Sequence, residues 1–137
     1  MTAGCAAKVE LVAPTLDPAT TGICDAVLAA LPATVLDGTR RPTTGGPATT
    51  AWGDPAITLR CGVDVPAGLG PASECLEVNG VGWYEERQPG GSLFTTIGRP
   101  AYVELAVPSH YAPEAGALVD VAHAISDHDP VQTPCVG

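Results

Sequence analysis

Residues 50–62 read Thr-Ala-Trp-Gly-Asp-Pro-Ala-Ile-Thr-Leu-Arg-Cys-Gly and combine a tight turn with an alternating strand. Gly53 and Pro55 are turn residues, because glycine adopts unusual dihedral angles easily and proline fixes φ. From Ile57 to Val63, apolar side chains occupy every second position, which is the period of a strand buried on one face. We expect this strand to lie centrally in a sheet, with the rest of the chain packed around it.

The next strong local signal is a hairpin. Asn79-Gly80 stands between two apolar runs and predicts a two-residue turn. Because such a turn fixes the register of its strands, the apolar side chains should match across it. The predicted pairs are Val78 with Val81 and Leu76 with Trp83.

Helices are predicted near both ends of the chain. Asp17 is a favourable N-cap and Pro18 suits the first helical position, so a helix should begin there and end before Pro32. A second helix should run from about Pro113 to Ile125, where apolar side chains recur at helical spacing. Further short strands are expected over residues 34–36, 93–97 and 102–107.

Short connections between strands, with helices at the two ends, predict an α+β fold. We expect one antiparallel sheet of four to five strands, with the N- and C-terminal helices packed on one face. Residues 1–16 are interpreted as an N-terminal tether and residues 17–137 as a single globular domain. Residues 42–50 and 64–74 are rich in turn-forming residues and should be loops.

The 137-residue chain has 15 acidic and 6 basic residues, and its net charge is −9 at pH 7. This charge argues against a nucleic-acid-binding protein, which needs a basic face to neutralise phosphates. It also argues against a polybasic contact with anionic lipid. No apolar run reaches the roughly 20 residues that span a bilayer. We expect no cofactor and no bound metal.

Five cysteines in a domain of this size indicate an oxidising compartment, where thiols pair as disulfides. Cys5 is the candidate for the unpaired one, because Ala3-Gly4-Cys5 resembles the end of a bacterial lipobox. A signal peptide preceding this sequence would then be cut before Cys5, whose thiol would carry lipid. The alternatives are that Cys5 is an ordinary residue of a flexible N-terminus, or that it follows a removed membrane segment.

The other four cysteines allow three pairings. Cys24 belongs to the apolar stripe of the first helix and Cys61 to the inward positions of the central strand, so the two should meet between helix and sheet. Cys75 alternates with the inward-facing Leu76 and should point away from this core, while Cys135 lies in a polar tail. We therefore predict the bridges Cys24–Cys61 and Cys75–Cys135.

In combination, several segments resemble an actinobacterial family known as domain of unknown function 3515. The matching segments are Cys24–Pro32, Arg40–Pro42, Ala51–Pro55, Leu59–Gly62, Glu77–Trp83, Phe94–Thr96 and Arg99–Glu104. The resemblance covers most of the chain and implies an envelope protein, often with an N-terminal membrane segment or lipobox. It implies no activity, because none is assigned to the family.

A candidate ligand-binding site consists of scarce basic and aromatic residues beside turns or on outward strand positions. Guanidinium groups bind carboxylates or phosphates, and a tryptophan ring stacks on sugars or cations. The candidate residues are Arg40, Arg41, Trp52, Arg60, Arg99 and Tyr102. The alternative is that Arg60 or Arg99 forms an internal ion pair with Asp54, Glu77 or Glu104.

No catalytic residue is predicted. The acidic and histidine residues at 120–129 are better explained by a solvated helix end than by a metal site, which needs three or four convergent ligands. No G-x-S-x-G nucleophile motif is present. Glu85-Glu86 is interpreted as a solvated strand edge rather than as a glycosidase pair.

These patterns predict an extracytoplasmic protein, anchored to the outer face of the cell membrane, that binds a ligand or protein without catalysis. The expected partner is an envelope protein or a small anionic or glycan ligand, and the membrane is contacted through the N-terminal anchor. The alternative is an enzyme that acts on cell-wall or lipid material, which a buried carboxylate in a pocket would favour.

Overall fold

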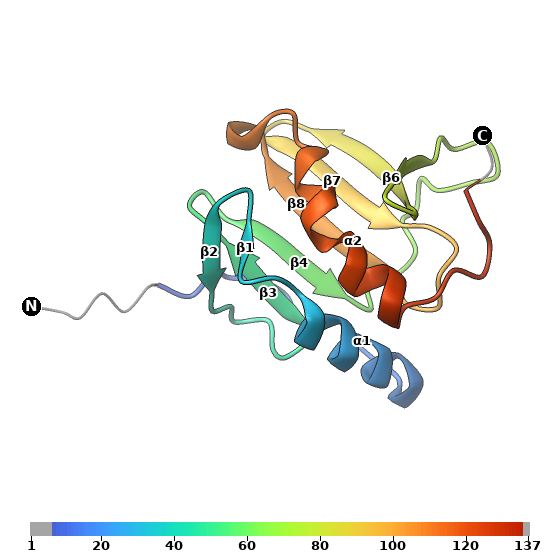
Figure 1. Ribbon diagram of the computed structural model, residues 1–137, viewed down its shortest axis with the longest axis horizontal. Helices are drawn as coiled ribbons and strands as arrows, with labels where there is room; N and C mark the ends of the chain where they lie inside the picture. Colours follow the sequence, from blue (N-terminus) through green and yellow to red (C-terminus); the bar gives the residue numbers. More distant parts are fainter. Residues whose placement is uncertain (1–6, 136–137) are drawn as a thin grey trace, which may run out of the picture.

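The computed structural model describes residues 7–135 and shows one antiparallel sheet with two helices on the same face (Figure 1). In chain order the elements are α1 (Pro18–Ala30), β1 (Thr34–Val35), β2 (Gly38–Arg41), β3 (Thr49–Trp52), β4 (Ile57–Cys61), β5 (Leu76–Val78), β6 (Val81–Gln88), β7 (Gly91–Thr96), β8 (Val103–Pro108), the 3₁₀ helix η1 (Ser109–Tyr111) and α2 (Gly116–His128). The strands lie in the order β1-β2-β3-β4-β8-β7-β6-β5. The α+β class and the antiparallel sheet are as predicted.

The helix ends follow from local chemistry. Asp17 caps α1 by accepting a hydrogen bond from the Thr20 N–H at 2.8 Å, which lowers the pKa of the Asp17 carboxyl group. The second helix begins at Gly116 and ends at His128, so it lies three residues later than predicted. Residues 112–115 form the turn between η1 and α2, and Pro113 therefore serves as a turn residue.

The β5–β6 hairpin has the predicted register, with Val78 opposite Val81 and Leu76 opposite Trp83. Asn79 and Gly80 have φ angles of 49° and 84°, in the left-handed region that a two-residue hairpin turn requires. The strand predicted to be central, β4, lies between β3 and β8.

The predicted number of strands, four to five, is wrong, because the sheet has eight. Two of the eight, β2 and β3, lie outside every segment predicted as a strand. They are short and lack apolar alternation, since β2 reads Gly-Thr-Arg-Arg and β3 reads Thr-Thr-Ala-Trp. All four side chains of β3 are buried, so both faces of this strand are covered. A strand covered on both faces does not show the alternating pattern that identifies a half-buried one.

A single hydrophobic core lies between the helices and the inner face of the sheet. Its largest fully buried side chains include Trp52, Trp83 and Phe94. Both helices contribute to it, α1 mainly through Val27 and α2 through several positions that include Leu118. The two helices also contact each other, so the core is closed on its helical side (Figure 1).

The structure brings both predicted cysteine pairs to disulfide distance. Cys24 and Cys61 are bridged inside the core, with a Cα–Cα separation of 5.6 Å. Cys75 and Cys135 are bridged with a separation of 5.9 Å, and their sulfur atoms lie against Gly82 of β6. The second bridge ties the C-terminal segment to the start of β5.

The described part of the predicted tether, residues 7–16, lies against the sheet. Val9 bridges to Thr43, and its N–H donates to the Pro42 carbonyl at 2.9 Å. Further along, the Arg60 side chain donates to the Val12 carbonyl at 3.2 Å. The segment therefore covers part of the sheet face that carries no helix. The proposed lipidation site at Cys5 is outside the described residues.

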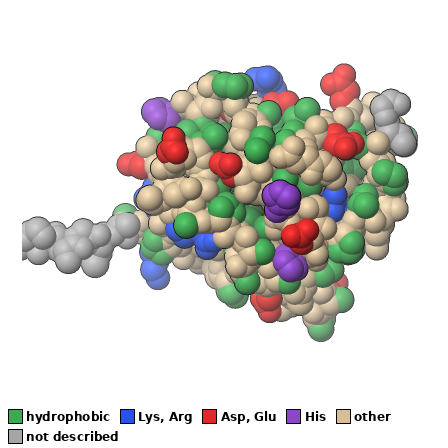
Figure 2. Space-filling model, in the orientation of Figure 1, with side chains coloured by type: hydrophobic (Ala, Val, Ile, Leu, Met, Phe, Trp, Pro, Cys, Tyr) green, Lys and Arg blue, Asp and Glu red, His purple; other side chains and the backbone are tan. Residues whose placement is uncertain are grey.

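Within residues 7–135, none of the helices has the length and apolar character needed to cross a membrane. Figure 2 shows the helix-bearing face of the molecule, where acidic side chains are scattered and hydrophobic side chains form small separate groups.

Candidate functional site

Arg60, the centre of the predicted ligand site, is paired within the chain. It lies on the helix-free face of β4, where its Nε and Nη2 donate to the two carboxylate oxygens of Glu104 at 2.8 and 2.9 Å. Its Nη1 donates to the Val12 carbonyl. Donating to the Glu104 carboxylate raises the pKa of Arg60. This bidentate pair is the internal alternative considered above, and it occupies the guanidinium fork.

Arg40 and Trp52 lie on the opposite, helix-bearing face. Trp52 is fully buried, and its indole N–H donates to the Pro32 carbonyl at 3.0 Å. Arg40 stacks over this ring at 5.5 Å and donates to the Leu31 and Pro32 carbonyls. Because these carbonyls belong to the end of α1, the two side chains supply hydrogen-bond donors to carbonyl groups that the helix itself leaves unpaired.

Arg41 and Tyr102 make other contacts, and Tyr102 lies two residues before Glu104, the partner of Arg60. The Arg41 Nη1 donates to the Gly53 carbonyl at 2.7 Å, and its Nη2 donates to the Ala7 carbonyl at 3.3 Å. Tyr102 immediately precedes β8, and its carbonyl accepts from the N–H groups of Gly62 and Val63. Arg41 therefore fixes a turn and the N-terminal segment.

Arg99 is buried beside Asp129, at the end of α2. Its Nη1 donates to the Asp129 carbonyl at 2.6 Å and its Nη2 to the Gly80 carbonyl at 2.8 Å. The Asp129 side chain is fully buried and accepts from the Ala101 N–H at 3.0 Å. Burial lowers the pKa of Arg99 and raises the pKa of Asp129 to about 6. This pair joins three segments of the fold and has no exposed surface on its carboxylate.

The structure thus distributes the six predicted ligand-binding residues over several places. Each of the four arginines donates to acceptors of its own chain. Near the C-terminus, Asp120 accepts from the Leu36 N–H at 2.9 Å, which gives this carboxylate a structural role. Among the residues that the structure describes, no group of three or more metal-ligating side chains is found.

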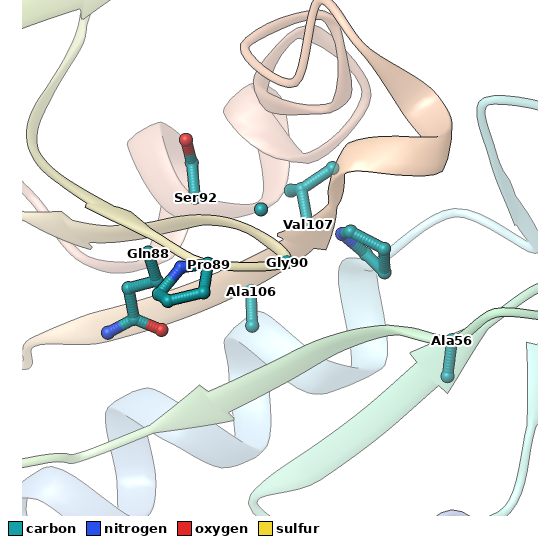
Figure 3. A pocket seen from close by; sticks show the side chains of 9 residues that line it. Ala56, Gln88, Pro89, Gly90, Ser92, Ala106 and Val107 are labelled. Carbon is teal, nitrogen blue, oxygen red and sulfur yellow. The ribbon is translucent and has the colours of Figure 1, made fainter.

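One hollow of the surface lies at the end of the sheet, with a volume of about 290 Å³ (Figure 3). It is lined by the β6–β7 turn, the end of β8 and the β3–β4 turn, with Gln88, Pro89, Gly90, Ser92, Ala106, Val107 and Ala56 labelled in Figure 3. No charged side chain among residues 7–135 lines it. It offers few groups with which to select a ligand.

A second hollow, of about 360 Å³, lies beside the β5–β6 edge of the sheet and combines charged, aromatic and apolar groups. We call it the edge groove; it is lined by Glu74, Leu76, Trp83, Tyr84, Glu85 and Arg87. A further hollow formed by residues 71–76 and Glu85 adjoins it and shares Glu74, Leu76 and Glu85 with it. The edge groove is the best-equipped candidate binding site of the described chain.

The floor of the edge groove is a buried aromatic side chain. Trp83 is fully buried and meets Phe94 edge-to-face, with ring centroids 6.4 Å apart. Its indole N–H has no acceptor among residues 7–135. Glu85 accepts from the Ser92 hydroxyl at 2.8 Å and lies 3.7 Å from the Arg87 guanidinium. Leu76, which is 36% exposed, contributes an apolar wall.

The edge groove exists because two adjacent strands differ in length. The β5 strand has three residues and pairs only with Val81–Trp83, whereas β6 continues to Gln88. Between residues 75 and 71 the chain leaves the line of β5. The sequence predicts a solvated strand edge at Glu85-Glu86 but does not predict the groove, because nothing in the sequence shows where the pairing of β5 with β6 stops. The turn-forming residues at 70–71 are the only signal that could have indicated it.

The comparisons with known proteins identify a family but no activity. The family described as "Protein of unknown function (DUF3515)" matches residues 3–133. No curated protein and no solved structure matches the chain. Since the match extends over nearly the whole sequence, the chain belongs to the DUF3515 family, as its sequence motifs predicted.

Proposed function

We propose that this protein is a binding module of the cell envelope, held at the outer face of the membrane by lipid on Cys5, and that it binds a partner protein through the edge groove. Two disulfide pairs support an extracytoplasmic location, because cytosolic thiols are kept reduced. The lipobox-like residues before Cys5 support the anchor.

The edge groove is the observation that carries the binding role. It joins a buried aromatic floor, an exposed leucine and two carboxylates beside a strand that β5 leaves uncovered beyond Trp83. An anionic small ligand would meet the carboxylates of Glu74 and Glu85 there and only one basic side chain, Arg87, among the described residues, whereas Arg60 and Arg99 donate to acceptors elsewhere. A partner protein is therefore the better match.

Site-specific photo-cross-linking in intact cells tests this function. A photoreactive amino acid replaces Leu76 in the edge groove, and in a matched control it replaces Val119 on α2, whose exposure is similar at 48%. We expect a discrete cross-linked adduct from position 76 and none from position 119. Equal adducts from both positions, or none from position 76, would contradict a binding role for the groove.

A further inference from the structure

We propose that the free edge of β6 binds an extended segment of a partner protein that is rich in Lys or Arg and that adds to the sheet as a further strand in line with β5. This inference rests on the proposed function, because it specifies how the partner occupies the edge groove. Strand addition of this kind takes its affinity from main-chain hydrogen bonds and its specificity from the side chains beside them.

The backbone of β6 is arranged for such an addition. In an antiparallel pair, the backbone groups of successive residues point alternately to the two sides of the strand. Gln88 and Gly91 close the β6–β7 hairpin, and the Gly82 carbonyl accepts from the Ile97 N–H at 3.0 Å. The backbone N–H and C=O groups of the even-numbered residues of β6 therefore face β7. The N–H and C=O groups of Glu85 and Arg87 therefore face the open edge.

These backbone groups have no partner strand. Pairing between β5 and β6 ends at Trp83, and no other backbone hydrogen bond involves Glu85 or Arg87 within the described chain. Two donors and two acceptors are thus presented in a row along one side of β6. An unpaired edge of this kind is a template for another extended chain.

The charge around the edge selects the composition of that chain. Glu74 is exposed at the mouth of the groove, Glu86 lies on the outer face of β6, and the side chain of Glu85 is 28% exposed. Arg87 is the one basic side chain that lines the groove among the described residues. Opposite charges across adjacent strands stabilise pairing, so a basic side chain should lie opposite Glu86 on the outer face of the sheet.

A second copy of this chain matches the edge less well. If two β6 strands paired antiparallel with Glu85 opposite Arg87, the Glu86 side chains of the two copies would lie directly opposite each other. Like charges in that position are destabilising. Each copy also carries a net charge of −9, which opposes self-association and favours a basic partner.

The test uses a synthetic peptide and the folded, disulfide-bonded protein. The probe is a seven-residue acetylated amide in which Lys and Val alternate. One control peptide has Glu in place of Lys, and another has methylated backbone nitrogens on alternate residues, which removes donors needed for strand pairing. Binding is followed by NMR titration, and hydrogen exchange is measured for individual backbone amides.

Strand addition predicts that saturation with the probe slows exchange of the Glu85 and Arg87 amides at least tenfold. Amides that face β7 are already paired and should change little. The double variant E74Q/E86Q should bind the probe at least fivefold more weakly, whereas the remote double variant E10Q/E114Q, which has the same net charge, should bind it like the native protein. The Arg87→Pro variant should lose binding, because proline removes an edge donor.

Several results would overturn the inference. The inference is wrong if methylation of the peptide backbone does not weaken binding. It is also wrong if the peptide slows hydrogen exchange only at amides outside β6, or if the Lys-Val peptide does not bind at millimolar concentration. Self-association through the β6 edge, seen by sedimentation, would assign the edge to a second copy. If the Arg87→Pro variant does not fold, the comparison of the methylated and unmethylated peptides on the native protein still tests strand addition. A cross-link from position 76 without strand addition would preserve the proposed function and reject only this mode of binding.

Discussion

At the scale of single residues, the buried carboxylate of Asp129 has a measurable effect on stability. Burial raises its pKa from 3.8 to about 6, so between these values the folded protein holds a proton that the unfolded chain has released. Stability therefore decreases as pH rises from about 4 to about 6 and stays lowered above that. Each pKa unit corresponds to about 1.4 kcal/mol, which sets this contribution at about 3 kcal/mol.

The Asp129→Asn variant isolates this effect. An asparagine side chain keeps an oxygen acceptor for the Ala101 N–H but does not titrate. The unfolding free energies of the variant and the native protein are measured by urea titration from pH 4 to pH 7. As pH rises, the variant should become more stable relative to the native protein. A difference independent of pH would show that Asp129 stays ionised throughout.

The arginines show what residue-level reasoning from sequence achieves and what it cannot. Their scarcity and their positions beside turns were visible in the sequence, and so was the possibility of a pair between Arg60 and Glu104. The acceptors chosen by Arg40 and Arg99 are backbone carbonyls at helix ends. A backbone carbonyl is present at every position, so no sequence pattern indicates which one a side chain will reach.

At the scale of elements, the Cys24–Cys61 bridge ties α1 to β4. In the chain-entropy model, a bridge that closes 37 residues contributes about 4 kcal/mol, and one that closes 60 residues contributes about the same. The inner bridge is also wholly buried, so the C24A/C61A variant should be destabilised more than C75A/C135A. Urea denaturation of both variants measures the two losses.

Peptide mapping without reduction checks the pairing itself. A peptide that joins Cys24 to Cys75 or Cys135 would contradict the structure, and so would free thiols at Cys24 and Cys61 after oxidative folding.

Elements were predicted correctly where a local rule fixes them. The Asn79-Gly80 turn determines the register of its hairpin, and Asp17 with Pro18 determines the start of α1. β3 was missed because tertiary contacts define it: both of its faces are buried, one of them on the side where the N-terminal segment lies. Local signals are enough to predict an antiparallel sheet, whereas predicting the number of its strands requires knowledge of those tertiary contacts.

At the scale of the whole molecule, the N-terminal segment sets the direction of the proposed anchor. The Ala7 carbonyl is held by Arg41 of β2, and Cys5 is two residues away, which is at most about 7 Å of chain. β2 and β6 are five strand spacings apart, or about 24 Å. Lipid on Cys5 would therefore place β2 near the bilayer and the edge groove on the far side of the sheet.

Mass spectrometry of the native protein from its own membrane should detect a mature N-terminus at Cys5 that carries lipid. On vesicles, paramagnetic lipids should relax a spin label at Asp54, which is close to Arg41, more strongly than a label at Arg87. Residues preceding Cys5 without a lipid adduct would contradict the anchor, and equal relaxation of the two labels would contradict the orientation.

The order of strands also has a mechanical consequence. A pull between a lipid on Cys5 and a chain bound to β6 would run across the sheet, along the direction of the inter-strand hydrogen bonds. Bonds loaded in this direction separate one pair after another, as in peeling, whereas bonds loaded along the strands must rupture together. The bound chain would be held by few backbone hydrogen bonds, so it would peel away at a force that leaves the eight-stranded sheet intact.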